Sequence, residues 1–400
     1  MMAKFNNLLV FSRKKIILSL SFLLLISSYS INPTIFSYLI FVLMVSLLFR
    51  AIMHRKLQVV AHDIIPLVFL FSWLYGVLIG IYNEVNLINV FSNFAGITLF
   101  SLYYAFCLFD IDKKSIVKIV AYAGFVNCMY SISNIYLILN VKYDGGDINA
   151  FRLYYSNGML VALPFLSLLL YRLSFKKNAD SSFLRSTTTL SILALTAIFA
   201  LLIMVSKGFT LALVFLLSAF MSVIFLRLLI KLRFSLGGLI IATTTAFLLG
   251  ISVYLFFDII AFNLSSKQAG NSIRSEQAIY LIEDFTFWGS GLGSSLSSGY
   301  IRDTKAYGFE LSFHNLIHKI GIFSSMIFFA YIFLISKSVW LMTTKPRGTD
   351  AENVFIAFGC LLSLVPSYGN PILFSPVSVF LQVIALFLLR PRYKKKVSIV

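Results

Sequence analysis

The sequence has few charged residues, and acidic residues are the scarcest of them. Only 12% of its 400 residues are charged, Asp and Glu together number 15, and 59% of the residues are hydrophobic. A water-soluble domain carries about twice that share of charge, so the composition excludes a soluble globular protein. Apolar runs of roughly 16–25 residues recur instead, and helices of that length cross a hydrocarbon core of about 30 Å. We therefore expect an integral membrane protein.

Patterns typical of several other classes are absent. No period-two alternation indicates a membrane β-barrel, and helices are the default because a backbone in lipid must satisfy its own hydrogen bonds. The only cysteines, Cys107, Cys128 and Cys360, lie inside apolar runs at spacings that fit no zinc site. We interpret them as small buried hydrophobic residues. The basic cluster Arg13–Lys15 precedes an apolar run without a small-residue cleavage site, so we expect an uncleaved first helix.

The apolar runs predict an all-α, polytopic fold that forms one membrane domain over residues 1–400. About twelve transmembrane helices are expected. They are placed at about 16–31, 34–49, 63–82, 85–109, 115–139, 153–173, 187–206, 208–230, 236–257, 315–341, 352–369 and 375–390.

Basic residues divide unevenly between the two ends of these helices. The two termini and every second connector hold 25 of the 33 Lys and Arg residues. The positive-inside rule makes that side cytoplasmic, so both termini are expected in the cytoplasm. The net charge of +18 is then a signal of topology and of attraction to anionic lipid, and we expect no nucleic-acid partner.

Three connectors on the opposite, outer side are more than simple turns. The first is the polar stretch Asn140–Arg152, and the second is the tight hairpin Ser206–Gly208, which carries Lys207. The third is a long loop at residues 258–314, too long for a mere connection between helices. Any chemistry is expected in this long loop, with help from charges at neighbouring helix ends.

A helix is expected inside the long loop. The spacing of apolar residues from Ile273 to Trp288 predicts an amphipathic helix on the outer membrane surface. Arg274 falls in its first turn, where the helix dipole disfavours a cation. Two interpretations remain open: an arginine in contact with solvent or lipid phosphate, or one that clamps a phosphate ligand.

The run Gly289–Gly293 follows this helix. Its spacing differs from G-x-G-x-x-G and no strand precedes it, so we reject a nucleotide site. A glycine-rich turn that brings the backbone close to a ligand or to another helix is expected instead.

Two histidines follow the long loop. His314 and His318 are four residues apart and would share one helical face, which Glu310 extends if the helix starts early. We expect no metal, because H-N-L-I-H lacks the glutamate of H-E-x-x-H and no third ligand is obvious. His314 is interpreted either as a histidine that only hydrogen-bonds or as a general base beside Asn315.

Two further basic residues face the outer side. Arg152 begins a predicted helix, and Lys207 lies in the middle of its hairpin. Lysine at such a place often extends to the membrane surface, but charge at membrane depth is costly and tends to mark function.

Several short motifs follow one another along the chain. They are R…NGM from Arg152, the Ser206–Gly208 hairpin, Arg274, the W-G-x-G-x-G run from Trp288, His314-Asn315, and Gly321 near the start of a helix. They cover about 206–330 and, weakly, 152–160. In this order the motifs resemble a known family, the O-antigen polymerase and O-antigen ligase superfamily of bacterial inner-membrane glycosyltransferases.

The resemblance implies transfer from undecaprenyl-diphosphate-linked glycan on the outer face, without metal or nucleotide cofactor. By matching position, His314 would activate the acceptor and Arg274 would hold the diphosphate. Lys207 stands where the family's hairpin has an arginine, and lysine offers charge without a bidentate fork. Arg152, Asn315 and His318 are further candidates for substrate binding, and Glu310 is a second candidate base.

The chemistry expected from the residues agrees with this resemblance. Cations would stabilise the diphosphate leaving group, and a histidine near neutrality would deprotonate the acceptor hydroxyl. Direct displacement inverts the anomeric centre and requires no paired carboxylates.

Four functions stay open. We favour a polymerase that joins lipid-linked repeat units. The alternatives are a ligase that transfers polymer to the lipid A core, a related envelope-polymer enzyme and, in another class, a lipid-linked oligosaccharide flippase or other transporter. A flippase would be expected to show charges along many helices and related halves. Besides the lipid-linked glycan and membrane lipid, expected partners are a chain-length regulator and a flippase. The expected location is the bacterial inner membrane.

Overall fold

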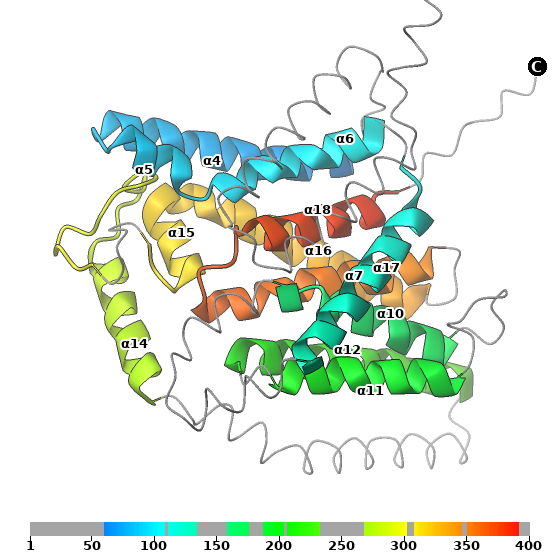
Figure 1. Cartoon of the computed structure of the whole chain (residues 1–400). Helices are drawn as coiled ribbons and strands as arrows, with labels where there is room; N and C mark the ends of the chain where they lie inside the picture. The colour runs from blue at the N-terminus through cyan, green and yellow to red at the C-terminus, as the bar shows by residue number, and fades with distance from the viewer. Residues whose placement is uncertain are drawn as a thin grey trace, which may run out of the picture.

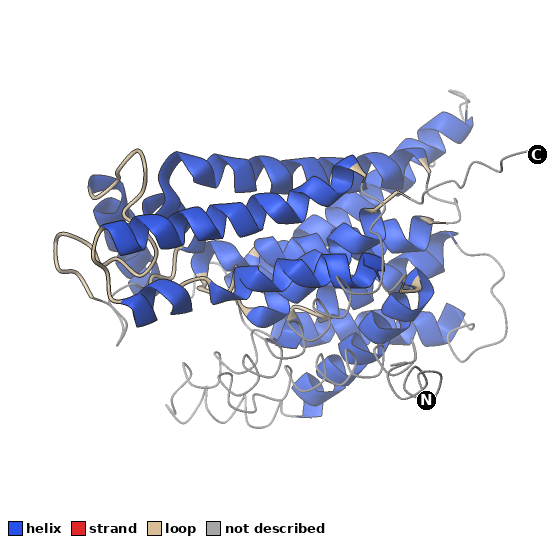
Figure 2. Cartoon of the chain, turned by 90° about the horizontal axis from the view of Figure 1, so that it is seen from above, coloured by secondary structure: helices blue, strands red, loops and turns tan. Residues whose placement is uncertain are grey.

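A computed structural model of the chain describes residues 60–108, 111–133, 158–175, 187–203, 206–232, 268–301, 308–345 and 350–391. The helices predicted at 16–31, 34–49 and 236–257 lie outside these residues, as does Arg152. Within the described ranges the chain is helical and has no strand, as Figure 2 shows.

The helices form a bundle with short helical turns between some of them (Figure 1). Their bounds are α4 Ile64–Tyr82, α5 Leu87–Ser92, α6 Leu102–Leu108, α7 Lys113–Ser133, α10 Ala162–Phe175, α11 Thr187–Ile203, α12 Lys207–Leu232, α14 Gln268–Glu283, α15 Ser312–Ile320, α16 Ser324–Thr344, α17 Ala351–Leu361 and α18 Pro376–Leu389. The 3₁₀ turns are η1 Ala61–Asp63, η2 Ala95–Ser101, η4 Gly321–Phe323, η5 Leu362–Leu364 and η6 Pro366–Gly369.

Five stretches of the described chain are long and apolar enough to cross a membrane: Ala61–Tyr82, Lys113–Ser133, Lys207–Leu226, Ser312–Thr344 and Ala351–Gly369. The prediction of an all-helical fold is confirmed for the part of the chain that the structure describes, and these five stretches are of the kind that a membrane protein needs. The count of about twelve spans stays a prediction.

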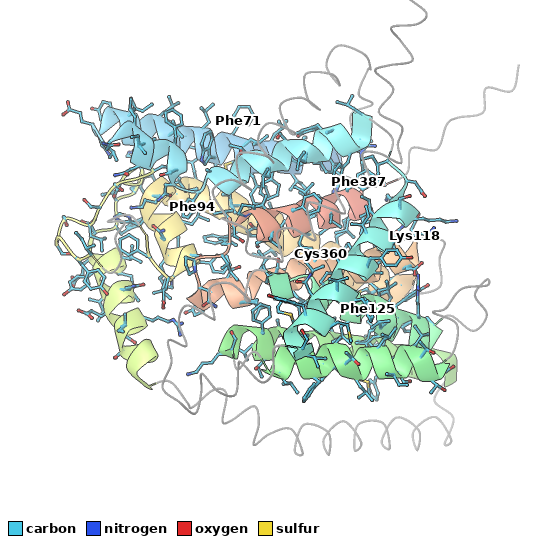
Figure 3. All side chains as sticks on the ribbon, viewed as in Figure 1. Phe71, Phe94, Lys118, Phe125, Cys360 and Phe387 are labelled. Atoms are coloured by element: carbon cyan, nitrogen blue, oxygen red, sulfur yellow. The ribbon has the colours of Figure 1, made fainter. Side chains whose placement is uncertain are left out.

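Two helices, α17 and α18, form the centre of the bundle. Every side chain from Val377 to Leu389 is buried, and so is every residue of α17 except Glu352. A helix that is apolar and buried all round belongs to the interior of a large bundle. Figure 3 shows Cys360 and Phe387 among the packed helices and Phe71 on the outer face of α4. Apolar side chains exposed as Phe71 is, at 64%, are suited to contact with lipid.

Three predicted helices differ from the structure in their course. The span predicted at 85–109 is broken into α5, η2 and α6, with Phe94 in the left-handed region at φ 54°. A Cβ on Gly96 would lie 1.9 Å from the carbonyl oxygen of Phe374, so the turn before α18 occupies the space next to this break.

The other two breaks lie near the candidate site. The helix predicted at 315–341 begins earlier, at Ser312, and is interrupted at Gly321, which has φ +55°. The helix predicted at 352–369 ends as α17 at Leu361 and continues as the turns η5 and η6. At these places the structure has local turns where regular helix was predicted, because neighbouring backbone segments pack there. Hydropathy does not encode such packing.

The bundle has two chemically different ends. At one end, which we name the basic end, Lys113 donates to the carbonyls of Leu388 and Arg390, both at 2.8 Å, and Arg172 pairs with Glu352 at 2.7 Å. Lys118 lies at the same end in Figure 3. The other end, which we name the loop end, carries α14, α15 and the segment between them (Figure 1). Residues that the charge pattern grouped on one side thus lie together, whereas the membrane side they face stays a prediction.

Candidate functional site

The segment after α14 runs back along α4 and does not stay above the bundle. The amide of Leu292 donates to the carbonyl of Gly76 at 2.9 Å, and the Asn83 side-chain amide donates to the carbonyl of Ser290 at 3.0 Å. Gly76 lies six residues before the end of α4, about 9 Å along the helix axis. Irregular backbone at such depth requires protein around it. Leu292 is accordingly fully buried.

Glycine makes this close approach possible. Gly289, Gly291 and Gly293 have φ values of +86°, +86° and +76°. A Cβ on Gly289 would lie 2.5 Å from the carbonyl oxygen of Lys319, and one on Gly291 would lie 2.4 Å from the amide nitrogen of Gly80. The prediction that this turn brings the backbone close to another helix is confirmed, and α4 and α15 are two of the helices that it contacts.

His318 fixes the same segment from α15. Its ring is fully buried, and Nε2 donates to Oδ2 of Asp284 at 2.8 Å. The hydroxyl of Ser290 lies 3.2 Å from that same nitrogen. A Ser-His-Asp relay needs the serine and the carboxylate on different ring nitrogens, so this group is no such triad. Burial acts to raise the pKa of Asp284, but hydrogen bonds from Ser297 and His318 outweigh it and hold the pKa below its ordinary value.

Lys319, the residue after His318 in α15, is also buried. The ammonium donates to the carbonyl and the hydroxyl of Ser294, the latter at 3.0 Å, and lies 5.4 Å from the centroid of the Phe309 ring. Sequence reasoning missed both Lys319 and Asp284. A basic residue directly after His318, in a helix that enters the membrane, was the available signal.

Helix α14 carries Arg274 but begins and ends about five residues earlier than the sequence predicted. Its inner face buries Gln277 and Leu281, while Ile279 and Ile282 are exposed on the other side. Ser275, Glu276 and Glu283 are exposed as well, so the outer side of the helix is mixed, and a polar residue lies on its buried side.

Arg274 and Glu310 form an ion pair. Nε of Arg274 donates to Oε2 of Glu310 at 3.0 Å, and the side-chain oxygen of Gln277 accepts from the Glu310 amide at 3.1 Å. Because α15 begins at Ser312, Glu310 lies before the helix and does not extend the face of the two histidines. Among the described residues, none accepts a hydrogen bond from the terminal guanidinium nitrogens of Arg274.

A turn near the C-terminus, Pro366–Asn370, packs against two of the elements that carry candidates. A Cβ on Gly208, the residue after Lys207 at the start of α12, would lie 2.6 Å from Cα of Pro366. A Cβ on Gly369 would lie 3.4 Å from Nε of Arg274. The start of α12 and the guanidinium of α14 therefore both lie beside this turn.

The same turn contacts α15. The hydroxyl of Ser312 donates to the carbonyl of Asn370 at 2.7 Å. The rings of His314 and Tyr368 have centroids 6.1 Å apart at 66° between their planes. His314 is half-buried and makes no hydrogen bond with any described residue. Sequence reasoning missed this turn, although two prolines around S-Y-G-N in an apolar stretch are a turn signal.

Several buried polar atoms on α14 and α15 have no hydrogen-bond partner within the described residues: Nε2 of Gln277, Nδ1 of His314, Oδ1 of Asn315 and Nδ1 of His318. A buried polar atom without a partner costs about 1–3 kcal/mol. Such atoms recur at sites where a polar ligand completes the hydrogen bonding.

The structure thus brings together some candidates and separates others. Arg274, Glu310, His314 and the helix start at Lys207 lie around the Pro366–Asn370 turn, and Asn315 is buried next to His314. His318 instead contacts Asp284 and the glycine-rich segment. Among the described residues no three His, Cys, Asp or Glu side chains come close enough to hold a metal ion.

Neither a scan against protein-family models nor a search of curated proteins finds a match for this chain.

Proposed function

We propose that the chain is a glycosyltransferase of the O-antigen polymerase type, which joins undecaprenyl-diphosphate-linked oligosaccharide repeat units. The observation that carries the proposal is the meeting of a guanidinium and a histidine at one turn. Arg274 and His314 both lie beside Pro366–Asn370, at the loop end of the bundle. A lipid-diphosphate leaving group needs a held cation, and a hydroxyl acceptor needs a base.

The position in the bundle fits a lipid-linked substrate. By the distribution of Lys and Arg, the loop end belongs to the outer side of the membrane. A substrate with a lipid tail in the membrane and a diphosphate at its surface would meet Arg274 near the ends of the helices. In the family that the sequence resembles, the donor is presented on this side.

Arg274 is suited to hold the diphosphate. Glu310 engages Nε, which fixes the plane of the guanidinium and leaves the terminal nitrogens, with four N–H donors, toward a ligand. Lys207 begins α12 directly before Gly208, which packs against Pro366, and would add positive charge. Both cations would stabilise the negative charge that develops on the leaving diphosphate.

His314 would act on the acceptor. A ring nitrogen takes the proton of the acceptor hydroxyl while that oxygen bonds to the anomeric carbon of the donor. The bond between the anomeric carbon and the phosphate oxygen breaks, and its electron pair leaves with the lipid diphosphate. Displacement from the opposite face inverts the anomeric configuration and forms no covalent enzyme intermediate.

A complementation experiment tests the proposal. Cells that lack the gene for this chain receive the wild type, Arg274→Ala or His314→Ala, and the surface glycan and lipid-linked glycan are profiled. We expect single capped repeat units without the chain or with either variant, and polymer with the wild type. Lipid-linked polymer that never reaches the lipid A core would instead indicate the ligase. Repeat units confined to the inner leaflet would indicate the flippase, and unchanged polymer in the deletion would refute all three.

A further inference from the structure

Tyr368 is an exposed aromatic residue on a rigid turn. Its side chain is 60% exposed, whereas its backbone amide donates to the carbonyl of Val365 at 3.2 Å. The Asn370 side-chain amide donates to the carbonyl of Pro366 at 2.8 Å, and the Ser367 hydroxyl donates to that of Ser363 at 2.8 Å. The turn is thus held by its own hydrogen bonds, and the ring is presented from a fixed base.

The surroundings of this ring are polar. His314 lies on one side with its ring centroid 6.1 Å away, and the next residue, Gly369, packs against the guanidinium of Arg274. Phe71, an exposed aromatic residue on α4, belongs instead to an apolar helix face. A ring that only anchors the protein at the membrane interface requires no histidine and arginine beside it.

We infer that Tyr368 forms a sugar-binding subsite, in which its ring stacks against the C–H face of a pyranose in the acceptor. The inference deepens the proposed function and rests on it. The face of an aromatic ring carries partial negative charge and attracts the partially positive C–H groups of a sugar. Tyrosine is suited to this role because only two side-chain torsions are ordered on binding.

Position assigns the subsite to the acceptor and not to the donor. A sugar stacked on Tyr368 directs hydroxyls at its edge toward His314, the proposed base. The donor diphosphate is assigned to Arg274, which lies at the neighbouring residue Gly369. Two successive residues of one turn therefore place the acceptor sugar and the leaving group next to each other, which is the arrangement that direct displacement needs.

The experiment uses the purified full chain in lipid nanodiscs and two probes from cells that lack the gene. One probe is the lipid-linked repeat unit; the other is its oligosaccharide after mild acid has removed the lipid diphosphate. Saturation-transfer NMR measures binding of the free oligosaccharide, and initial rates measure glycosyl transfer. We expect Tyr368→Ala to abolish the binding signal and to raise the acceptor KM about tenfold with a small change in kcat. Tyr368→Phe and Tyr368→Trp should retain both.

Tyr82→Ala is the matched control, since Tyr82 is 83% exposed at the end of α4, at the loop end, without a candidate residue beside it. It should leave binding and KM unchanged. Equal losses of folded protein in Tyr368→Ala and Tyr82→Ala, with normal kinetics in both, would make Tyr368 an interface anchor and overturn the subsite. Failure of Tyr368→Phe together with Tyr368→Ala would assign the effect to the hydroxyl and overturn stacking.

The two proposals fail separately. A wild type that transfers glycan and whose acceptor KM is the same in Tyr368→Ala overturns the subsite and leaves the proposed function standing. A wild type that binds the free oligosaccharide through Tyr368 and transfers nothing from the lipid-linked probe overturns the proposed function and leaves the subsite standing.

Discussion

Two histidines at opposite ends of the bundle show how differently the ends are built. At the basic end, Nε2 of His62 donates to the carbonyl of Leu386 at 2.9 Å and Nδ1 accepts from Lys337 at 3.3 Å. At the loop end, His314 makes no hydrogen bond with any described residue. A histidine with both nitrogens engaged is part of the architecture, whereas one with neither engaged is suited to bind or deprotonate a ligand.

The neighbouring charges repeat this contrast. Asp63 at the basic end is 2% exposed and accepts from Nε and a terminal nitrogen of Arg390, both at 2.9 Å, and from the hydroxyl of Tyr103. Arg274 at the loop end gives only Nε to Glu310 among the described residues. Complete pairing satisfies the charges at a helix junction and makes the loss of one partner costly, whereas incomplete pairing leaves donors for an anion. The predictions below test this division.

The largest effect is expected at His314. His314→Ala should slow glycosyl transfer by about 10²–10⁴-fold because the base is lost, with normal donor binding and normal protein level. His314→Gln should fail as well, since an amide is not basic. The measurement is the initial rate of purified protein. His62→Gln serves as control and should lower the unfolding temperature without changing the rate per folded molecule. A near wild-type rate in His314→Ala would remove the base assignment and make Glu310 the leading candidate.

The second-largest effect on glycosyl transfer is expected at Arg274. Arg274→Ala should reduce transfer by about 10²–10³-fold through loss of charge stabilisation at the leaving group. Arg274→Lys should keep only part of the activity, because lysine retains the charge but lacks the bidentate fork of arginine. Lys207→Arg should be tolerated. The assay compares rates at saturating lipid-linked donor. Full activity in Arg274→Ala would show that the wild-type arginine is only a surface charge paired with Glu310.

At the basic end the effect should be on stability and not on rate. Asp63→Asn leaves Arg390 beside a neutral amide in a buried setting, and removal of one partner of a buried ion pair costs about 3–5 kcal/mol. We expect a lower unfolding temperature and less folded protein, with a normal rate per folded molecule. Thermal unfolding in detergent, together with the rate assay, checks this. If Asp63→Asn lost the transfer rate but kept the wild-type unfolding temperature, the basic end would take part in function.

The smallest effect concerns Asp284. Its folded-state pKa is depressed, so the ionised form stabilises the fold at pH values above the ordinary 3.8, and this contribution is lost as pH falls through the lower folded-state pKa. The unfolding temperature of the wild type should therefore exceed that of Asp284→Asn above pH 3.8, and the gap should close at lower pH. An equal gap at every pH would show that the charge of Asp284 contributes nothing.

Part of the candidate site could be predicted from its residues. Long apolar runs required helices, and scarce charges at the start of α15 and in α14 drew attention to His314 and Arg274. The glycine run required a close backbone approach. The partner of each group could not be predicted, since Glu310 lies 36 residues from Arg274 and the Gly369 contact lies still further along the chain.

The sequence by itself determined that the chain forms helices, that several of them are apolar enough to span a membrane, and how its basic residues divide between helix ends, because hydropathy and charge act locally along a chain. Only the tertiary structure decided that the Pro366–Asn370 turn lies between α12, α14 and α15, and that the segment after α14 descends along α4. Such contacts depend on how helices pack against one another, and that packing is set by side-chain shape across distant parts of the chain. The same packing places Tyr368 beside His314, a pair 54 residues apart whose proximity no local pattern encodes.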